Sequence, residues 1–398
     1  MSLEHLWAEG EVVTRWITFV RSSEDVLRCA AIEDMQEVLI ESAAFARQGR
    51  LSDQDALSLA VLAREHDLRP VFVWDILMPE EVMSQVSKHL LELDLTAFSA
   101  IRVRDIGAAA WLEEYFPDKS IQLVLDDGNH NLEGLLGWCE IFGERLERIV
   151  LSNELPRQKL EEYCTKLPVK CEILGVGRIM LFYSPRPLLS KNFHSKEGES
   201  ALWIESISAS KESKEKPFPT IETMHGTMMF LHKDRFVLDR LDTLWEAGLH
   251  AVCIDLRHLS ESSHAASDIQ NLCARLQKGD TTIRADWPNA TLAPFFKSNN
   301  STAQFYRLKS KLHVLRDETC LAQLVAGQNG EYVAYFTLRP FSIEEVGSIV
   351  LPSGEEIPFP WESFQDTFGN TLKGCQAEQL VVTPWIKKAC SGALLRAK

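Results

Sequence analysis

Polar side chains follow three apolar segments of the chain, at the point where each segment ends. "IQLVLDDGNHN" ends in carboxylates, amides and an imidazole, "RIVLSNE" in a hydroxyl, an amide and a carboxylate, and "AVCIDLRH" in a carboxylate, a guanidinium and an imidazole. Such groups bind metal ions, transfer protons or hold anions. The residues are Asp126, Asp127, Asn129, His130 and Asn131; Ser152, Asn153 and Glu154; and Asp255, Arg257 and His258. Alternating Asp, Gly and Asn also build turns, so the first cluster has a purely structural interpretation as well.

A second candidate for chemistry is the stretch "ETMHGTMMFLHKD", from Glu222 to Asp234. His225 stands just before an apolar, strand-like run, and Lys233 and Asp234 follow that run. Histidine is the side chain whose charge changes most readily near neutral pH, which suits it to acid–base chemistry. The alternative is that His225 only makes structural hydrogen bonds.

Short strand-like runs alternate with amphipathic helical segments from residue 16 onward, and these elements must position the polar groups. Repeats at roughly 20–27 residue spacing predict a parallel sheet with right-handed crossovers. "KCEILGV" and "RFVLDRLDTLWEAGLHAVCIDLR" extend the series to roughly eight units, and the chain has no G-x-G-x-x-G turn. The sequence therefore predicts an α/β fold, a TIM-barrel-like parallel βα barrel whose strand ends carry the site.

The chain divides into two predicted domains. Residues 1–309 form the barrel, and a polar segment at about 190–220, with the core "SASKESKEK", is too charged to pack and is expected to be an exposed excursion. After about residue 310 the character changes to β-rich runs around the turn "PSGEE". Residues 310–398 are therefore predicted to form a small C-terminal β domain.

Composition narrows the class of protein. The 398 residues are 45% hydrophobic and 25% charged, as in a well-packed globular protein. No segment reaches the roughly 18 consecutive apolar residues of a membrane span, and the N-terminus has no basic and apolar leader. The nine cysteines include no C-x-x-C pair, which indicates reduced thiols, and we predict a cytoplasmic location without membrane contact. A net charge of −15 argues against broad coating of nucleic acid but leaves room for a local basic groove.

Two blocks of the sequence resemble the collagenase-like peptidase family U32. They are "LSNELPRQKLEEYCTKLPVKCEILGVGRIMLFYSPRPLLS" and "ETMHGTMMFLHKDRFVLDRLDTLWEAGLHAVCIDLRH". The resemblance implies a barrel-like catalytic domain and a bacterial cytosolic protein. The family is named for proteolysis, but other members take part in oxygen-independent hydroxylation of ubiquinone precursors or of bases in transfer and ribosomal RNA. Those members carry an iron–sulfur cluster on four cysteines.

The chain departs from that cysteine pattern at every ligand position. Met180, Pro187 and Phe236 stand where the family has cysteines, and the segment 190–220, where the fourth is expected, contains none. Proline and phenylalanine donate nothing to iron, and methionine offers only a weak thioether. "YSPRPLLS" thus keeps the tyrosine, serine and arginine of a cluster-binding turn while proline replaces the ligand. We expect no cofactor in this chain.

The resemblance also supplies candidate site residues. The candidates for catalysis are His225, Glu222 and Glu154, and the candidates for substrate binding are Arg186, Tyr183, Asn131, Lys233, Asp234 and Arg257. In this interpretation His225 and Glu222 exchange protons, while Arg186 and Arg257 hold an anionic group. Because prolines flank Arg186 and fix its backbone, we expect its guanidinium to point into the barrel mouth, with His225 within reach of the same cavity.

Three functions remain open from the sequence. The first is hydroxylation-type modification of RNA or of a small anionic aromatic substrate, without a cluster of the chain's own. The second is a non-catalytic paralogue or scaffold that pairs with a cluster-bearing relative, in which His225 and Glu222 tie the excursion back onto the barrel by hydrogen bonds. The third is proteolysis, for which no Ser/His/Asp, Cys/His or H-E-x-x-H arrangement is present.

Overall fold

The computed structural model describes residues 16–125, 131–190, 203–209, 217–259, 268–299 and 317–398. The chain divides into two compact units, residues 1–300 and 301–398, each with a hydrophobic core of its own. This division falls nine residues before the predicted domain boundary at 309/310.

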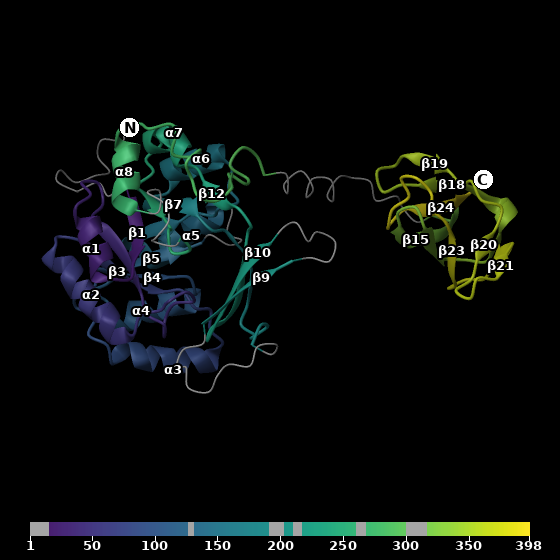
Figure 1. Cartoon of the computed structure of the whole chain (residues 1–398). Coiled ribbons are helices and arrows are strands. Elements are labelled where there is room, and N and C mark those ends of the chain that lie inside the picture. Colours follow the sequence, from purple (N-terminus) through teal and green to yellow (C-terminus); the bar gives the residue numbers. More distant parts are fainter. Residues whose placement is uncertain (1–15, 126–130, 191–202, 210–216, 260–267, 300–316) are drawn as a thin grey trace. The chain divides into compact units, whose positions relative to one another are not determined.

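Eight parallel strands close a barrel in the first unit (Figure 1). The last of them, β13, pairs with β1 on one side and with β7 on the other, which completes the ring. The strands are β1 (Trp16–Val20), β2 (Glu37–Glu41), β3 (Arg69–Trp74), β4 (Ala100–Val103), β5 (Ser120–Val124), β6 (Leu146–Val150), β7 (Lys170–Gly177) and β13 (Ala251–Ile254). The predicted TIM-barrel-like fold is confirmed, and so is the small C-terminal β domain described below.

Helices connect the strands and cover the outside of the barrel (Figure 1). They are α1 (Ser23–Ala30), α2 (Asp53–Glu65), α3 (Glu80–Leu91), α4 (Ile106–Tyr115), α5 (Leu132–Phe142), α6 (Arg157–Lys166), α7 (Asp242–Glu246) and α8 (Ile269–Gln277). Several begin where a side-chain oxygen accepts a backbone N–H of the first turn, as Ser22, Ser52 and Asp105 do. These caps fix where the loops before α1, α2 and α4 end.

Alternation along β2 explains why the barrel interior is charged. Val38 and Ile40 point outward into the apolar layer under the helices, whereas Leu39 packs inside the barrel. Because successive side chains of a strand point to opposite faces, Glu37 and Glu41 share the inner face with Leu39. The apolar core between strands and helices therefore stabilises the fold, and the interior carries polar groups.

A four-stranded antiparallel sheet follows β7, in the order β8–β11–β10–β9. Its strands are β8 (Met180–Ser184), β9 (Trp203–Ser208), β10 (Phe218–Thr223) and β11 (Gly226–Phe230). Strand β9 lies within the segment predicted as an exposed excursion, and it pairs with β10 over six residues. For residues 203–208 the expectation that the segment does not pack is wrong, because backbone pairing holds these residues in a sheet. Residues 191–202 and 210–216 lie outside the described residues. Strands β12 (Asp234–Phe236) and β14 (Thr291–Leu292) extend the barrel sheet beside β7.

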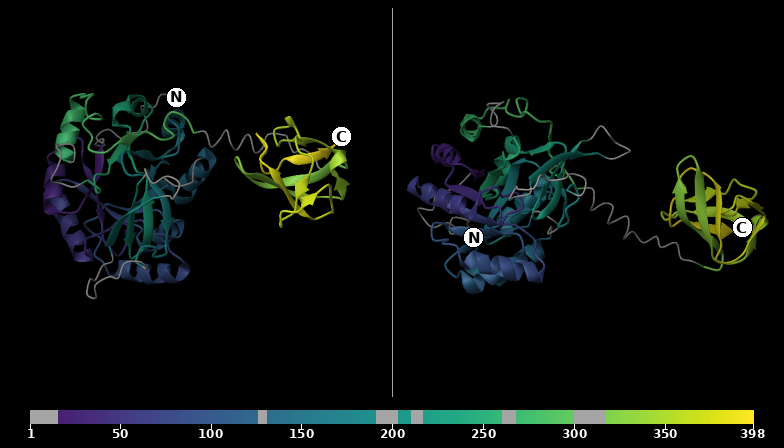
Figure 2. Two further views of the ribbon diagram at one scale, coloured as in Figure 1. Left: turned by 45° about the vertical axis from the view of Figure 1, so that its right-hand side comes forward. Right: turned by 60° about the horizontal axis from the view of Figure 1, so that its bottom comes forward.

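The second unit is an antiparallel β domain whose strands curve around one apolar core (Figure 2). Its strands are β15 (Cys320–Gln328), β16 (Tyr332–Thr337), β17 (Phe341–Ser342), β18 (Val346–Val350), β19 (Glu356–Pro358), β20 (Phe364–Gln365), β21 (Thr371–Leu372), β22 (Gly374–Cys375), β23 (Leu380–Pro384) and β24 (Leu394–Ala397). Among the helices that the structure describes in either unit, none combines the length and the apolarity needed to cross a bilayer.

Candidate functional site at the barrel mouth

A cavity of about 440 Å³ opens at the carboxyl ends of the barrel strands, between the strands and β8. This is the end of a βα barrel at which the loops converge. The cavity is lined by Phe19, Glu41, Arg47, Gln48, Val73, Asp75, Arg102, Arg104, Val124, Val150, Asn153, Glu154, Glu172, Leu174, Arg178, Ile179, Met180, Leu181, Phe182, Tyr183, Phe230, Cys253, Asp255, Arg257 and Phe295. Five arginines, five carboxylates and five aromatic rings therefore surround one space.

An ion network inside the barrel forms the floor of the cavity. Arg102 donates to both carboxylate oxygens of Glu172, at 2.8 and 2.5 Å, and to the amide oxygen of Gln122. Arg148 donates to Glu37 at 2.5 Å and to Glu172 at 3.2 Å. All five side chains are buried. Since each cation faces carboxylates within hydrogen-bond distance, the floor is rigid and close to neutral.

One wall carries a second arginine cluster. Arg257, which follows β13, donates to both oxygens of Asp255 at 2.9 and 2.7 Å and to Glu41 at 2.6 Å. Its guanidinium lies 3.5 Å from the centroid of the Phe19 ring. Burial alone would raise the pKa of Asp255, but the neighbouring guanidinium outweighs it and the pKa falls well below its usual range. The wall thus presents a fixed, planar cation stacked on an aromatic ring.

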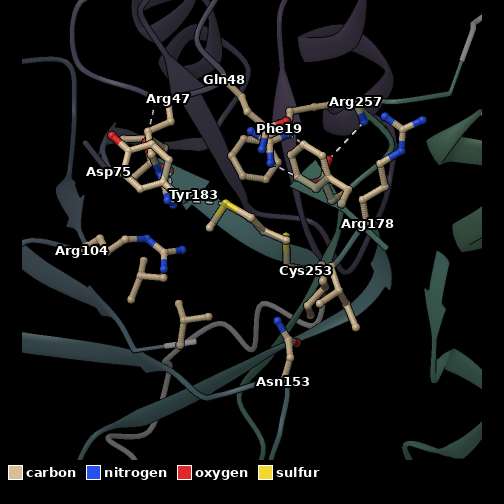
Figure 3. Close-up of a pocket in the computed structure, with 18 of the residues that line it drawn as sticks. Phe19, Arg47, Gln48, Asp75, Arg104, Asn153, Arg178, Tyr183, Cys253 and Arg257 are labelled. Atoms are coloured by element: carbon tan, nitrogen blue, oxygen red, sulfur yellow. Dashed lines mark hydrogen bonds and ion pairs between the residues drawn. The ribbon is translucent and has the colours of Figure 1, made fainter. Parts of the chain in front are cut away.

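A neighbouring part of the cavity wall repeats the pattern with different residues (Figure 3). Arg47 donates to Asp75 at 3.2 and 3.1 Å, and its guanidinium lies 5.1 Å from the centroid of the Tyr183 ring. The Tyr183 hydroxyl donates to the backbone oxygen of His225 at 2.7 Å, so its ring is held in place. Arg47 also contacts the Met180 sulfur at 3.6 Å. Two arginine–aromatic pairs therefore line the part of the cavity at the ends of the neighbouring strands β13, β1, β2 and β3.

Three of the predicted site residues line this cavity: Glu154, Tyr183 and Arg257. Glu154 lies exposed in the loop after β6, Tyr183 lies on β8, and Arg257 follows β13. Their roles stay predictions, but the structure brings them together in one place.

Arg186 is not part of the cavity, and the prediction that it points into the barrel mouth is wrong. It lies exposed on the turn after β8. Its carbonyl accepts a hydrogen bond from the Thr227 hydroxyl at 2.9 Å, and its N–H donates to the Ser184 hydroxyl at 3.2 Å. The backbone of the Pro-Arg-Pro turn is thus bound to the sheet, which leaves the guanidinium in solvent.

Glu222 holds the same turn and does not reach the cavity. Its buried carboxylate accepts hydrogen bonds from the N–H groups of Leu189 and Ser190, at 2.5 and 2.9 Å, and from the Thr227 hydroxyl at 2.8 Å. Burial favours a raised pKa, but these three donors outweigh it and lower the pKa of Glu222. A carboxylate whose oxygens are occupied in this way is a structural acceptor.

His225 is likewise committed to backbone, so the expectation that it reaches the cavity is wrong. Its Nε2 lies 2.7 Å from the carbonyl oxygen of Ala43, in the loop after β2, and the residue is absent from the cavity lining. Burial lowers the pKa of the imidazole, although the hydrogen bond to Ala43 opposes this. Together with Glu222, His225 ties the four-stranded sheet and the turn after β8 onto the barrel.

The remaining predicted residues lie elsewhere. Asn131 caps α5 by accepting the N–H of Gly134 at 2.6 Å, and Asp234 is buried, where it accepts hydrogen bonds from His258, Trp287 and Asn289. Lys233 is half-buried and is absent from the cavity lining. Residues 126–130, which include most of the first polar cluster, lie outside the described residues.

Charged residues within or directly after apolar strands are what the sequence analysis missed. They include Glu41 and Glu172 inside strands, Arg102 in "IRVRD", and Asp75 at the end of "VFVWD". The sequence itself shows these charged residues inside apolar strand runs. A charge on the inner face of a barrel strand is costly to bury unless it is paired, so such a residue predicts a buried partner. Such residues therefore mark polar clusters inside a barrel.

The three positions at which the family has cluster cysteines do not fit an iron–sulfur cluster. Met180 contacts Arg47, Pro187 lies exposed on the turn, and Phe236 is buried with its ring centroid 5.4 Å from that of Trp287. Within the described ranges, no three His, Cys, Asp or Glu side chains are placed to hold a metal ion. The donor set is thus wrong in chemistry as well as in position.

Comparisons with known proteins relate the chain to one family. The sequence model of peptidase family U32 matches residues 41–285. The chain is 20% identical over 254 residues to the tRNA hydroxylation protein P2 of Bacillus subtilis (strain 168), a similarity covering 60% of this chain and 79% of that protein. Similar solved structures include the C-terminal domain of a Geobacillus thermoleovorans putative U32 peptidase (14% identity, 21% of this chain, 98% of that chain, TM-score 0.20). Another is the U32 peptidase Mk0906 (12% identity, 45% and 75%, TM-score 0.35).

Proposed function

The chain belongs to peptidase family U32, and from this membership together with the cavity we propose that it takes part in hydroxylation-type modification of an RNA base or a small aromatic substrate. The observation that carries the proposal is the cavity itself, which is lined by two arginine–aromatic pairs at the barrel mouth. The similarity to a protein named for tRNA hydroxylation supports the same substrate chemistry.

The lining residues are suited to bind and orient a flat ring. Guanidinium planes and aromatic faces stack on planar π-systems, and the cavity volume of about 440 Å³ falls in the usual range for small-molecule sites. Asp255 and Glu41 fix Arg257, and Asp75 fixes Arg47, so little side-chain entropy is lost when a ligand enters. In this proposal the chain binds and orients the substrate ring with side chains that are already held in place.

The oxidising chemistry would have to come from elsewhere, because Met180, Pro187 and Phe236 cannot hold a cluster. This favours, as a second candidate, a scaffold that pairs with a cluster-bearing relative. In that arrangement the cavity presents the substrate and the partner performs the electron transfer.

Anaerobic reconstitution with iron and sulfide is expected to leave the chain without a stoichiometric cluster. The measurements are visible absorption and iron per chain after desalting, with a sulfide-free sample as the control for loosely bound iron. About four irons per chain with a cluster absorption band would contradict the prediction.

Proteolysis is disfavoured by the chemistry of the cavity. Among its described lining residues there is no serine, threonine, histidine or lysine, and its one thiol belongs to Cys253. Burial raises the pKa of Cys253 well above its usual value, which keeps it a neutral thiol and a poor nucleophile.

The proposed function is tested by deleting the gene and comparing modified nucleosides and quinones with those of the wild type by mass spectrometry. Loss of one hydroxylated species, restored by the wild-type gene, is the expected result. Complementation with an Arg257→Gln variant is expected to fail, while Arg186→Gln, altered in the exposed turn, should restore the product. Unchanged pools of both classes in the deletion strain would refute the proposal and leave the scaffold role.

A further inference from the structure

Arg178 differs from the other arginines of the cavity in having no described partner. It directly follows β7, so it stands at the mouth of the barrel, and it lines the cavity. No hydrogen bond or ion pair joins its guanidinium to any residue that the structure describes, whereas Arg47, Arg102 and Arg257 each bind carboxylates. Arg178 and Arg104 lie on opposite sides of the cavity (Figure 3).

The carboxylates whose charge reaches Arg178 are already engaged by other donors. Asp234 and Asp255 act on it only from beyond ion-pair distance, and burial lowers its pKa more than they raise it. Asp234 is bound to His258, and Asp255 is bound to Arg257. The third carboxylate, Glu205, is bound to Arg50 at 2.8 Å. None of the three is therefore free to neutralise Arg178.

A second uncompensated cation lies next to this position. Arg235 on β12 is fully buried and pairs in register with Gly177, the residue before Arg178. It donates only to backbone oxygens, those of Leu174 at 2.8 Å and Asn153 at 3.1 Å. Burial without a carboxylate partner lowers the pKa of Arg235 to about 10, so it remains charged at neutral pH. The end of β7 is thus the electropositive side of the site.

We propose that Arg178 is the specificity-determining residue of the cavity and binds an oxyanion carried by a planar aromatic ligand. The ring enters beside the two arginine–aromatic pairs, and the oxyanion remains at the mouth, where Arg178 donates to it. This replaces the expected roles of Arg186 and Arg257, of which the first lies in solvent and the second is neutralised. The inference rests on the proposed use of the cavity as the substrate site, but not on any hydroxylation step.

The oxyanion has two sources that share this chemistry, an aromatic carboxylate and a nucleotide phosphate. Matched probes separate them: benzoate against phenol, and uridine 5′-monophosphate against uridine. In each pair the ring is the same and the charge differs. Binding is measured by calorimetry on the full chain at low and at moderate salt. The anionic member of at least one pair is expected to bind about 10- to 100-fold more tightly, with a preference that shrinks as salt rises.

Variants assign this preference to one residue. Arg178→Gln should reduce the ratio between neutral and anionic probe to about one, and Arg178→Lys should keep part of it. Because Arg178 has no described partner, the melting temperature should stay unchanged. The matched control is Arg186→Gln, the same substitution eight residues further on in the exposed turn, and it should behave as wild type.

Three outcomes would overturn the inference. In the first, Arg178→Gln leaves the preference for the anionic over the neutral probe unchanged. In the second, Arg186→Gln loses this preference to the same extent, and in the third neither anionic probe binds at millimolar concentration. These results are distinct from failure of the proposed function. Anion-selective binding through Arg178 with unchanged nucleosides and quinones in the deletion strain would keep the subsite and reject the hydroxylation role.

Discussion

Replacing Arg148 by methionine is expected to lower the free energy of unfolding by about 3–5 kcal/mol, the cost of breaking a buried ion cluster from one side. Arg148 is buried on β6 inside the barrel, where it binds Glu37 and Glu172 at once. Its removal leaves two buried carboxylates that share the remaining cations Arg69 and Arg102. The measurement is equilibrium unfolding in urea at neutral pH.

The matched control is Arg28→Met on the surface helix α1. Arg28 and Glu24 form an ion pair with the same 2.5 Å separation as Arg148 and Glu37, but Glu24 is exposed to solvent and Arg28 is half-exposed. Exposed pairs of this kind contribute only roughly 0.3–0.5 kcal/mol. If the free energy of unfolding falls by the same small amount in both variants, the barrel network contributes no more to stability than a surface ion pair. Partial recovery in the double variant Arg148→Met, Glu37→Leu would confirm that the penalty comes from the unpaired carboxylate.

The barrel could be predicted because its signal is local and repeated. Each strand is a short apolar run, each helix is amphipathic, and helices begin at residues such as Ser22 and Ser52 that cap them. Counting such units needs no knowledge of which strand lies next to which. The strand β9 was missed because it stands next to the charged run "SASKESKEK", and its place in a sheet depends on pairing with β10.

Only part of the site was predicted from the sequence. Glu154 and Arg257 follow barrel strands and line the cavity, and Tyr183, which the family resemblance supplied, lines it too. Glu222 and His225 lie in a stretch with the same chemical appearance, but long-range hydrogen bonds to Leu189 and Ala43 commit them to the fold. Nothing in the spacing of a sequence distinguishes a carboxylate that accepts three hydrogen bonds from one that faces a cavity.

Acid is expected to destabilise the barrel in two ranges of pH. Burial lowers the pKa of His250 from 6.5 to about 3, with Arg148 and Lys170 adding to the effect. Burial alone would raise the pKa of Glu37, but Arg148 and Arg69 outweigh it and lower the pKa from 4.5 to about 2. In both cases the unfolded chain binds the proton first, so stability is lost as pH falls, below about 6.5 for His250 and below about 4.5 for Glu37.

His250→Gln separates the first range from the second. The slope that His250 adds approaches about 1.4 kcal/mol per pH unit below pH 6.5, so the wild type should lose about 1.6 kcal/mol between pH 6.5 and pH 5 through this residue, and the variant should lose that much less. The readout is the slope of unfolding free energy against pH, which does not depend on any constant cost of the substitution.

His225, whose pKa burial also lowers, keeps its own share of the slope in both proteins. His66→Gln, altered at the exposed end of α2, should leave the slope unchanged. An unchanged slope in His250→Gln would mean that this imidazole is hydrated or paired in the folded state, and the acid sensitivity would then have to arise from the carboxylates of the ion network.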